Sequence, residues 1–155
     1  MKKVLTILFA ILFVLVADLT TKHFLFAISE YTLIPHVLTI DTNFGNTGAA
    51  FGLFSGNTFA LIIVSALMII GLLIFNHFIK NKNTFYCLAF GFIIGGALGN
   101  MYDRLRYGYV RDFINLDFLK FIPTFNLADS FLCIGVVMLA IFLLCMTGGK
   151  NEKKV

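Results

Sequence analysis

Four long stretches of apolar residues divide the chain, and short polar segments separate them. Each stretch is about as long as the roughly 20 residues that a helix needs to cross the hydrocarbon core of a bilayer. The pattern therefore predicts an all-α membrane protein with four transmembrane helices, folded as a single membrane domain over residues 1–155. The predicted spans cover residues 4–26, 58–79, 84–104 and 126–147.

The segments between the spans differ in length. Residues 27–57 and 105–125 connect the spans on one side, and a short turn at Lys80–Asn83 connects them on the other. Within the longer segment, Val37–Thr42 alternates apolar and polar residues, a pattern typical of a short strand. We therefore predict a strand and an interfacial loop at one surface of the membrane.

The composition agrees with a membrane protein and argues against two other classes. Hydrophobic residues make up 59% of the chain and charged residues 13%, against a usual charged share of roughly 25%. The mean hydropathy is +0.93. A soluble domain of 155 residues could not bury this much apolar surface, and a disordered chain needs the opposite composition.

The N-terminus also has features of a secretory signal peptide, because Met1-Lys2-Lys3 precedes an apolar run. However, this run continues past Ala17 into Asp18, and no small-x-small cleavage site precedes a polar region. We therefore predict that the segment is retained as the first span. The chain has no Leu-x-x-Cys lipobox, so we do not expect it to be a lipoprotein itself.

The few charged residues predict the orientation of the spans. An even number of spans brings together seven of the 12 basic residues, which are Lys2, Lys3, Lys80, Lys82, Lys150, Lys153 and Lys154. The positive-inside rule puts this side, with both termini, in the cytoplasm. Seven of the eight acidic residues fall on the other side. The net charge of +4 therefore reflects orientation and gives no reason to expect nucleic-acid binding.

The first span carries an acid and a base near its outer end. Asp18 lies 15 residues after Lys3, or about 22 Å along a helix, and Lys22 follows four residues later on the same face. An ionisable residue within a span is costly and indicates function by default. The alternative is a snorkelling lysine with a structural partner.

The third span combines a glycine stripe with a polar end. Gly91, Gly95 and Gly99 recur every four residues, a spacing that allows a neighbouring helix to approach closely. The polar residues that follow on this face are Asn100, Asp103 and Arg104, related by helical spacings of three and four. An amide such as that of Asn100 could bind the backbone of a peptide.

Two further acids flank the second outer segment. Asp112 lies among aromatic and apolar residues, and Asp129 opens the fourth span. If Asn126 caps that helix, Asp129 occupies its third position, which favours a carboxylate. An ordinary loop acid and simple capping are the alternatives. Two carboxylates held close together share a proton, so that one acts as a base toward water and the other as an acid.

Other catalytic chemistries find little support in the chain. The three cysteines, Cys87, Cys133 and Cys145, lie inside spans without Cys-x-x-Cys spacing and are expected to pack as small apolar residues. The three histidines are scattered, and neither His-Glu-x-x-His nor Gly-x-Ser-x-Gly occurs. We therefore expect no metal, no organic cofactor and no nucleic-acid partner.

Five segments in order resemble the motifs of the lipoprotein signal peptidase (signal peptidase II) family, the membrane aspartic peptidases of bacteria. The matching segments are Asp18-Leu19-Thr20-Thr21-Lys22, Asn46-Thr47-Gly48-Ala49-Ala50-Phe51-Gly52, Gly95-Gly96-Ala97-Leu98-Gly99-Asn100-Met101-Tyr102-Asp103-Arg104, Val110-Arg111-Asp112-Phe113 and Phe125-Asn126-Leu127-Ala128-Asp129. They lie on the same four-span frame, so the resemblance covers nearly the whole chain.

The resemblance implies a role for each matching residue. Asp112 and Asp129 would form the catalytic pair, and Asp103 would support the scaffold. The residues that would bind substrate or support the site are Asp18, Lys22, Asn46, Gly99, Asn100, Arg104, Asn126 and Ala128. Residues 27–57 would form a small outer sheet that cradles the substrate.

The resemblance also implies a substrate and a location. The enzyme would cleave prolipoproteins just before a Cys that carries diacylglycerol, without a cofactor. It would act as a monomer among the lipids of the bacterial cytoplasmic (inner) membrane, with its active site near the outer face. Cyclic peptide inhibitors of the family, such as globomycin, would be expected to bind.

The chain departs from the family pattern in three respects. Leu19 replaces a frequent Gln, and Arg111 replaces a small apolar residue directly before Asp112. If Arg111 folds back, it could lower the pKa of the neighbouring carboxylate. The chain also lacks Trp, so Phe and Tyr would have to serve at the interface.

Two other functions have to be weighed. A small transporter or proton channel also uses acids within the membrane, but its polar residues would be spread through the bilayer depth. Here the inner halves of the spans are apolar. A membrane assembly subunit could use the glycine stripe, but it would not need two acid-bearing motifs around one loop.

Overall fold

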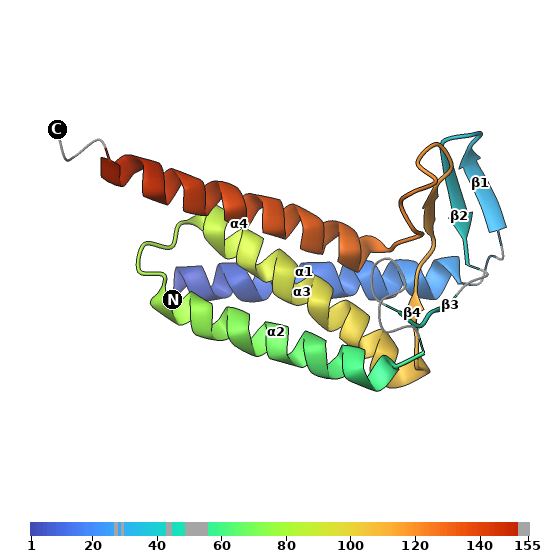
Figure 1. Ribbon diagram of the computed structural model, residues 1–155, viewed down its shortest axis with the longest axis horizontal. Helices are drawn as coiled ribbons and strands as arrows, with labels where there is room; N and C mark the ends of the chain where they lie inside the picture. Colours follow the sequence, from blue (N-terminus) through green and yellow to red (C-terminus); the bar gives the residue numbers. More distant parts are fainter. Residues whose placement is uncertain (27, 29, 43–44, 49–55, 152–155) are drawn as a thin grey trace.

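The computed structural model describes residues 1–26, 28, 30–42, 45–48 and 56–151, with side chains described to residue 146. The predicted four-helix membrane architecture is confirmed. The helices are α1 (Lys2–Leu25), α2 (Thr58–Phe78), α3 (Thr84–Tyr107) and α4 (Leu127–Asn151). Within the described residues, all four are long and apolar enough to span a membrane. Figure 1 shows them side by side, with the strands gathered at one end.

Helix α3 forms the centre of the bundle, and its glycines explain why. A Cβ added to Gly91 would lie 2.5 Å from the Ala10 Cβ, and one added to Gly95 would lie 2.9 Å from the Val14 Cβ. Only a residue without a side chain permits α1 to come this close. The predicted glycine stripe is thus the face that packs on α1. Helix α4 packs against another side of α3, where Gly96 faces the backbone carbonyl of Ala128.

Polar caps and aromatic packing define the helix ends. Asn57 and Asn83 cap α2 and α3, since their side-chain oxygens accept from the backbone N–H of Ala60 at 3.1 Å and Tyr86 at 2.9 Å. Helix α3 ends at Gly108, whose φ of 82° is left-handed and suits glycine. Near the opposite end of the bundle, Tyr86 and Phe142 pack ring to ring in the apolar core.

Two small antiparallel sheets lie beyond the helices. The first has the order β1–β2–β5, formed by Glu30–Ile34, Leu38–Asp41 and Ile114–Leu116. The second pairs β3 (Gly45–Asn46) with β4 (Val110–Arg111). The strand predicted at Val37–Thr42 is present as β2. The prediction that the sheet comes from residues 27–57 was incomplete, because β4 and β5 belong to the second outer segment.

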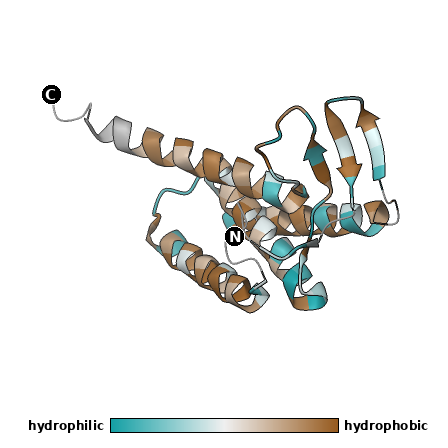
Figure 2. Cartoon of the chain, turned by 45° about the vertical axis from the view of Figure 1, so that its right-hand side comes forward, coloured by the Kyte–Doolittle hydropathy of each residue, from teal (hydrophilic) through white to brown (hydrophobic). Residues whose placement is uncertain are grey.

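The arrangement of the strands determines where the acid-bearing loop lies. Strand β5 is joined to β2 by the pairs Leu38–Leu116 and Ile40–Ile114, and Ile114 also forms a bridge with Phe125. Asp112 therefore lies between two short paired strands, and its carboxylate contacts Asn126, the residue directly before α4. Figure 2 shows polar residues gathered where the sheets meet the helices and apolar residues along the bundle.

Candidate active site

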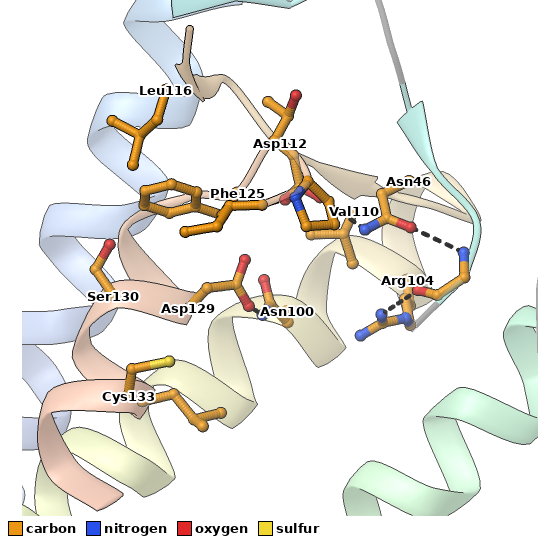
Figure 3. A pocket seen from close by; sticks show the side chains of 15 residues that line it. Asn46, Asn100, Arg104, Val110, Asp112, Leu116, Phe125, Asp129, Ser130 and Cys133 are labelled. Atoms are coloured by element: carbon orange, nitrogen blue, oxygen red, sulfur yellow. Dashed lines mark hydrogen bonds between the residues drawn. The ribbon is translucent and has the colours of Figure 1, made fainter. Parts of the chain in front are cut away.

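A cavity of about 510 Å³ opens at the end of the bundle that carries the sheets. Asp112 and Asp129 both line it, from β4–β5 and from α4 (Figure 3). The other lining residues are Asn46, Gly48, Asn100, Arg104, Val110, Leu116, Ile122, Pro123, Thr124, Phe125, Ser130, Leu132 and Cys133. Besides the two acids, three of the residues predicted for the site, Asn46, Asn100 and Arg104, thus converge on one concave surface, which combines polar and apolar walls.

Asp112 is buried, and both of its carboxylate oxygens accept hydrogen bonds from amides. The Asn126 Nδ2 donates to Oδ1 at 2.6 Å, and the Asn46 Nδ2 donates to Oδ2 at 2.8 Å. No cation is paired with Asp112 among the described residues. Its carboxylate is therefore oriented by neutral amides, which do not compensate its negative charge.

The surroundings of Asp112 raise its pKa to about 7. Burial has the largest effect, and the negative charge of Asp129 adds to it. The hydrogen bonds from Asn46 and Asn126 and the charge of Lys22 act in the opposite direction. A carboxyl group with a pKa near neutrality can hold or release a proton at physiological pH, as an acid–base catalyst must.

Asp129 is fixed by the first turn of α4. The Asn126 Oδ1 accepts from the backbone N–H of Asp129 at 3.0 Å, and the Asp129 Oδ2 accepts from the backbone N–H of Asn126 at 3.2 Å. These reciprocal bonds form a capping box, in which Asp129 is the third helical residue. The predicted capping is thus confirmed. It uses one carboxylate oxygen, and the other accepts from the Asn100 Nδ2 at 2.7 Å.

Two asparagine amides connect the two acids. The Asn126 Nδ2 donates both to Asp112 and to the Asn100 Oδ1, the latter at 3.0 Å. The Asn100 Oδ1 also faces the Lys22 ammonium at 3.4 Å. Because a backbone N–H and an ammonium can only donate, the oxygen ends of both amides are fixed, and their N–H ends must face the carboxylates. Each acid is therefore held in one orientation.

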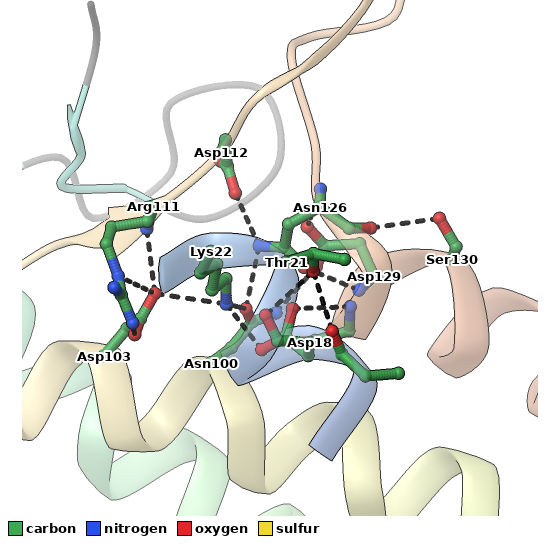
Figure 4. Close-up of polar contacts among 12 residues, drawn as sticks. Asp18, Thr21, Lys22, Asn100, Asp103, Arg111, Asp112, Asn126, Asp129 and Ser130 are labelled. Carbon is green, nitrogen blue, oxygen red and sulfur yellow. Dashed lines mark hydrogen bonds and ion pairs between the residues drawn. The ribbon is translucent and has the colours of Figure 1, made fainter. Parts of the chain in front are cut away.

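A second group of charges lies behind this amide pair, and we call it the charge cluster: Asp18, Lys22, Asp103 and Arg111 (Figure 4). The Lys22 Nζ lies 2.8 Å from the Asp18 Oδ2 and 3.1 Å from the Asp103 Oδ2. Lys22 is 0% exposed, so it does not snorkel to the surface and cannot reach a substrate in the cavity. Of the two roles open for Asp18 and Lys22, the geometry favours support of the site.

Arg111 points away from Asp112, contrary to the possibility that it folds back onto that carboxylate. Its Nη2 donates to the Asp103 Oδ1 at 2.8 Å, and its backbone N–H donates to Asp103 Oδ2 at 3.0 Å. Its guanidinium also lies over the ring of Tyr107, 4.4 Å from the centroid. Side chains of successive residues in an extended segment point to opposite faces, so Arg111, at the end of β4, and Asp112, directly after it, face different sides.

Gly99 and Ala128 lie where the charge cluster meets α4. The Asp18 Oδ1 accepts from the backbone N–H of Ala128 at 3.0 Å. A Cβ added to Gly99 would lie 2.7 Å from the Asp18 Oδ2 and 3.3 Å from the Ala128 Cβ. Both positions therefore require small residues, because α1, α3 and α4 meet here at close range.

Asn46 and Arg104 bring a backbone segment to the edge of the cavity. The Asn46 Oδ1 accepts from the backbone N–H of Gly48 at 2.9 Å, and the Arg104 Nη2 donates to the Gly48 carbonyl at 3.0 Å. Within the described residues the buried Arg104 Nε has no hydrogen-bond partner. The rest of this motif, Ala49-Ala50-Phe51-Gly52, falls outside the described residues.

The apolar wall of the cavity was not predicted from the sequence. It includes Leu116 from β5 and Ile122, Pro123 and Phe125 from the segment before α4. Cys133, expected to pack as a small apolar residue within a span, also lines the cavity, one turn after Asp129. Its helical spacing of four from Asp129 was the signal that could have indicated this position.

The chain is similar to one protein family over most of its length. A family profile described as "Signal peptidase (SPase) II" matches residues 10–145. The lipoprotein signal peptidase of Clostridium novyi (strain NT) is 42% identical over 144 residues, which cover 86% of this chain and 94% of that protein. The lipoprotein signal peptidase of Staphylococcus aureus (strain JH9) is 39% identical over 150 residues, which cover 92% of this chain and 90% of that protein.

The fold is also found in solved structures. One is a bacterial membrane enzyme structure obtained by the in meso method at 2.3 Å resolution, with a TM-score of 0.78 and 36% identity. The similarity covers 99% of this chain and 94% of the chain in that structure. Another, obtained by the same method at 1.9 Å resolution, has a TM-score of 0.74 and 34% identity and covers 92% of each chain.

Proposed function

Because the chain belongs to the signal peptidase II family, we propose that it is an aspartic endopeptidase that uses Asp112 and Asp129 to activate water. The single observation that carries this proposal is the arrangement of the two acids on one cavity. They approach it from different elements, and each is oriented by neutral amide donors. This arrangement keeps both carboxyl groups available to exchange protons.

The proposed reaction begins with one proton shared by the two acids. The ionised carboxylate removes a proton from a water molecule, whose oxygen attacks the carbonyl carbon of the peptide bond. The protonated acid donates to the carbonyl oxygen and so stabilises the tetrahedral intermediate. The acid that took the proton from water then donates it to the leaving nitrogen as the C–N bond breaks, and the re-formed carbonyl group returns its proton to the other acid. The apparent pKa values belong to the pair and not to one residue.

The substrate that we propose is a prolipoprotein whose Cys already carries diacylglycerol, and cleavage occurs just before this Cys. Support comes from the relatives named lipoprotein signal peptidase and from the mixed cavity wall. The polar side, with Asn46 and Arg104, can bind a peptide backbone. The apolar side, with Leu116 and Phe125, can receive apolar groups. Globomycin-like cyclic peptides would occupy the same surface.

The orientation that we propose places this cavity near the outer face of the cytoplasmic membrane, with both termini inside. The basis is the excess of Lys residues at the end of the bundle away from the strands. Asp18, Lys22, Asp103 and Arg111 then act as positioning residues, since their hydrogen bonds lead toward the acids through Asn100, Ala128 and the backbone of β4.

The test uses the purified protein in detergent with a diacylglyceryl-modified prolipoprotein. Asp112→Asn and Asp129→Asn are each expected to lower kcat by about 10³-fold or more, because each removes one member of the acid–base pair. Mass spectrometry should place the new N-terminus at the lipid-modified Cys. Cooperative thermal unfolding of each variant would establish that the loss is chemical.

Asp117→Asn provides the matched control for these substitutions. Asp117 accepts hydrogen bonds from Thr39 and Asn115 on the sheet and does not line the cavity, so activity should be retained. Full activity in either Asp112→Asn or Asp129→Asn would refute the acid pair. Efficient cleavage of a substrate without diacylglycerol would refute the proposed substrate class.

A further inference from the structure

The segment between β5 and α4, residues 118–125, exposes two large aromatic side chains. Phe118 is 60% exposed and Phe121 is 73% exposed. Lys120 lies exposed between them. A pair of exposed Phe side chains beside a Lys is unfavourable in water but suits the membrane interface, where apolar and cationic groups both find partners.

The position of this segment along α4 places it at the depth of that interface. The apolar part of α4, Leu127–Met146, has 20 residues and is therefore about 30 Å long. This length equals the hydrocarbon thickness of a typical bilayer. The residues directly before Leu127 must then lie where the hydrocarbon ends and the headgroups begin.

The fold also turns this segment toward the membrane. In Figure 1, β1 is the strand farthest from the helices, and the orange segment after β5 lies on the side of the sheet nearer to α4. Figure 2 shows that this loop is largely apolar. Residues 118–125 therefore lie between the outer part of the sheet and the end of α4.

Backbone hydrogen bonds hold the segment in shape. The backbone N–H of Leu119 donates to Leu116 at 2.9 Å, and that of Ile122 donates to Leu119 at 2.9 Å. Phe125 and Ile114 exchange two backbone bonds at 3.1 and 2.8 Å. The same segment supplies Ile122, Pro123, Thr124 and Phe125 to the cavity wall. Residues 122–125 of this segment thus line the cavity, whereas Phe118 and Phe121 lie outside it and are exposed.

We propose that residues 118–125 form a lipid contact that inserts Phe118 and Phe121 into the interfacial layer of the outer leaflet, with Lys120 against lipid phosphates. The occupant is the bilayer surface itself, because the contact continues the apolar surface of α4 and carries a matching charge. A consequence, which rests on the proposed function, is that the cavity wall is held at the depth where a lipid-anchored peptide presents its cleavage site.

The absence of Trp from the chain allows a direct test of the lipid contact. Phe118→Trp and Phe121→Trp each introduce a single fluorescent reporter at an exposed position. In liposomes of phosphatidylcholine and phosphatidylglycerol, both are expected to emit at short wavelength. Phospholipids brominated near the glycerol end of their acyl chains should quench them more strongly than phospholipids brominated near the methyl end.

Two further single-Trp variants calibrate the depth. Tyr31→Trp, on β1, should emit as in water and resist quenching by either lipid. Val137→Trp, on the exposed face of α4, should be quenched most by lipids brominated near the methyl end. If Trp at 118 and 121 behaves like Trp at 31, the segment faces water and the proposal is wrong.

A kinetic measurement tests the consequence separately. The double substitution Phe118→Ser and Phe121→Ser should raise KM for the lipid-modified substrate in liposomes by about tenfold, since two apolar anchors are lost. Tyr31→Ser is the control and should leave KM unchanged. If Trp at 118 and 121 is quenched but the wild type cleaves no substrate, the proposed function is refuted and the lipid contact is supported. If the wild type cleaves the substrate but neither Trp is quenched, the lipid contact is refuted and the proposed function is supported.

Discussion

Two groups of charged residues lie next to each other at one end of the bundle, and they differ in what faces each carboxylate. In the charge cluster, Asp18 and Asp103 are paired with Lys22 and Arg111. On the cavity, Asp112 and Asp129 accept from Asn46, Asn100 and Asn126. One group is balanced by cations, and the other is oriented by neutral amides.

This difference explains how the same residue type can serve two purposes. A cation beside a buried carboxylate compensates its charge, so the pair acts as a structural link between the helices. A neutral amide fixes the orientation of a carboxylate and opposes its burial cost only in part, so the proton can still be exchanged. None of the four described members of the charge cluster lines the cavity.

The largest effect should come from removing the central cation of the charge cluster. Lys22→Met leaves Asp18 and Asp103 facing each other in a buried site. The free energy of unfolding is expected to fall by about 3–5 kcal/mol, the usual cost of breaking a buried ion pair on one side. Thermal unfolding in detergent micelles would measure the loss. Lys80→Met, at an exposed position, is the matched control and should change little.

A double variant separates an electrostatic role of Lys22 from simple packing. Asp18→Asn combined with Lys22→Met removes both charges and keeps an oxygen for the backbone N–H of Ala128. It should be more stable than Lys22→Met alone, because no uncompensated partner remains in that pair. If the changes in the free energy of unfolding caused by the two substitutions are simply additive, the attraction between Asp18 and Lys22 does not stabilise the cluster.

Much of this arrangement could be predicted from the sequence, where composition or spacing alone decides the outcome. The four spans follow from the length of the apolar stretches. The glycine stripe follows from a four-residue spacing, although the sequence does not say that α1 is the helix that packs on it. The capping of α4 by Asn126 follows from local rules that involve only the next three residues.

Contacts between distant segments could not be predicted in the same way. Strand β5 has three residues, too few for an alternating pattern, and its pairing with β2 joins two outer segments. The pairing of Arg111 with Asp103 could not be predicted without knowing that the chain is extended at residues 110–112. In an extended segment the side chains alternate, so those of Arg111 and Asp112 point to opposite faces. The apolar wall of the cavity depends on both of these features together.

The pH dependence of stability should sharpen the contrast at Asp112. Its pKa is about 7 in the folded protein and about 4 in an unfolded chain. Between these values the folded state binds more protons than the unfolded state, so stability falls as pH rises from about 4 to about 7. The total fall attributable to this group is about 2–4 kcal/mol.

Measurements of thermal unfolding from pH 4 to pH 8 in wild type and Asp112→Asn would check this expectation. The variant cannot ionise at position 112, so its stability should decline less over this range. Activity in the wild type should decline above about pH 7, as the pair loses its shared proton. Parallel stability curves for the two proteins would contradict the assignment of the raised pKa to Asp112.

The smallest effect on stability is expected at Arg111, which stands where the family pattern has a small apolar residue. Arg111→Val removes the guanidinium from Asp103 and Tyr107. However, Asp103 keeps Lys22 at 3.1 Å and the backbone N–H of residue 111 at 3.0 Å. We expect a loss of about 1–2 kcal/mol in the free energy of unfolding, well below that of Lys22→Met.

Arg111→Lys retains the charge but not the two-point contact with Asp103, so its stability should fall between those of the wild type and Arg111→Val. Arg106→Val provides the control, because Arg106 is exposed and its contact with the Tyr107 ring is longer, at 5.6 Å. That variant should unfold within about 0.5 kcal/mol of the wild type. If Arg111→Val were as damaging as Lys22→Met, the two cations would contribute equally, and Lys22 would not be the centre of the cluster.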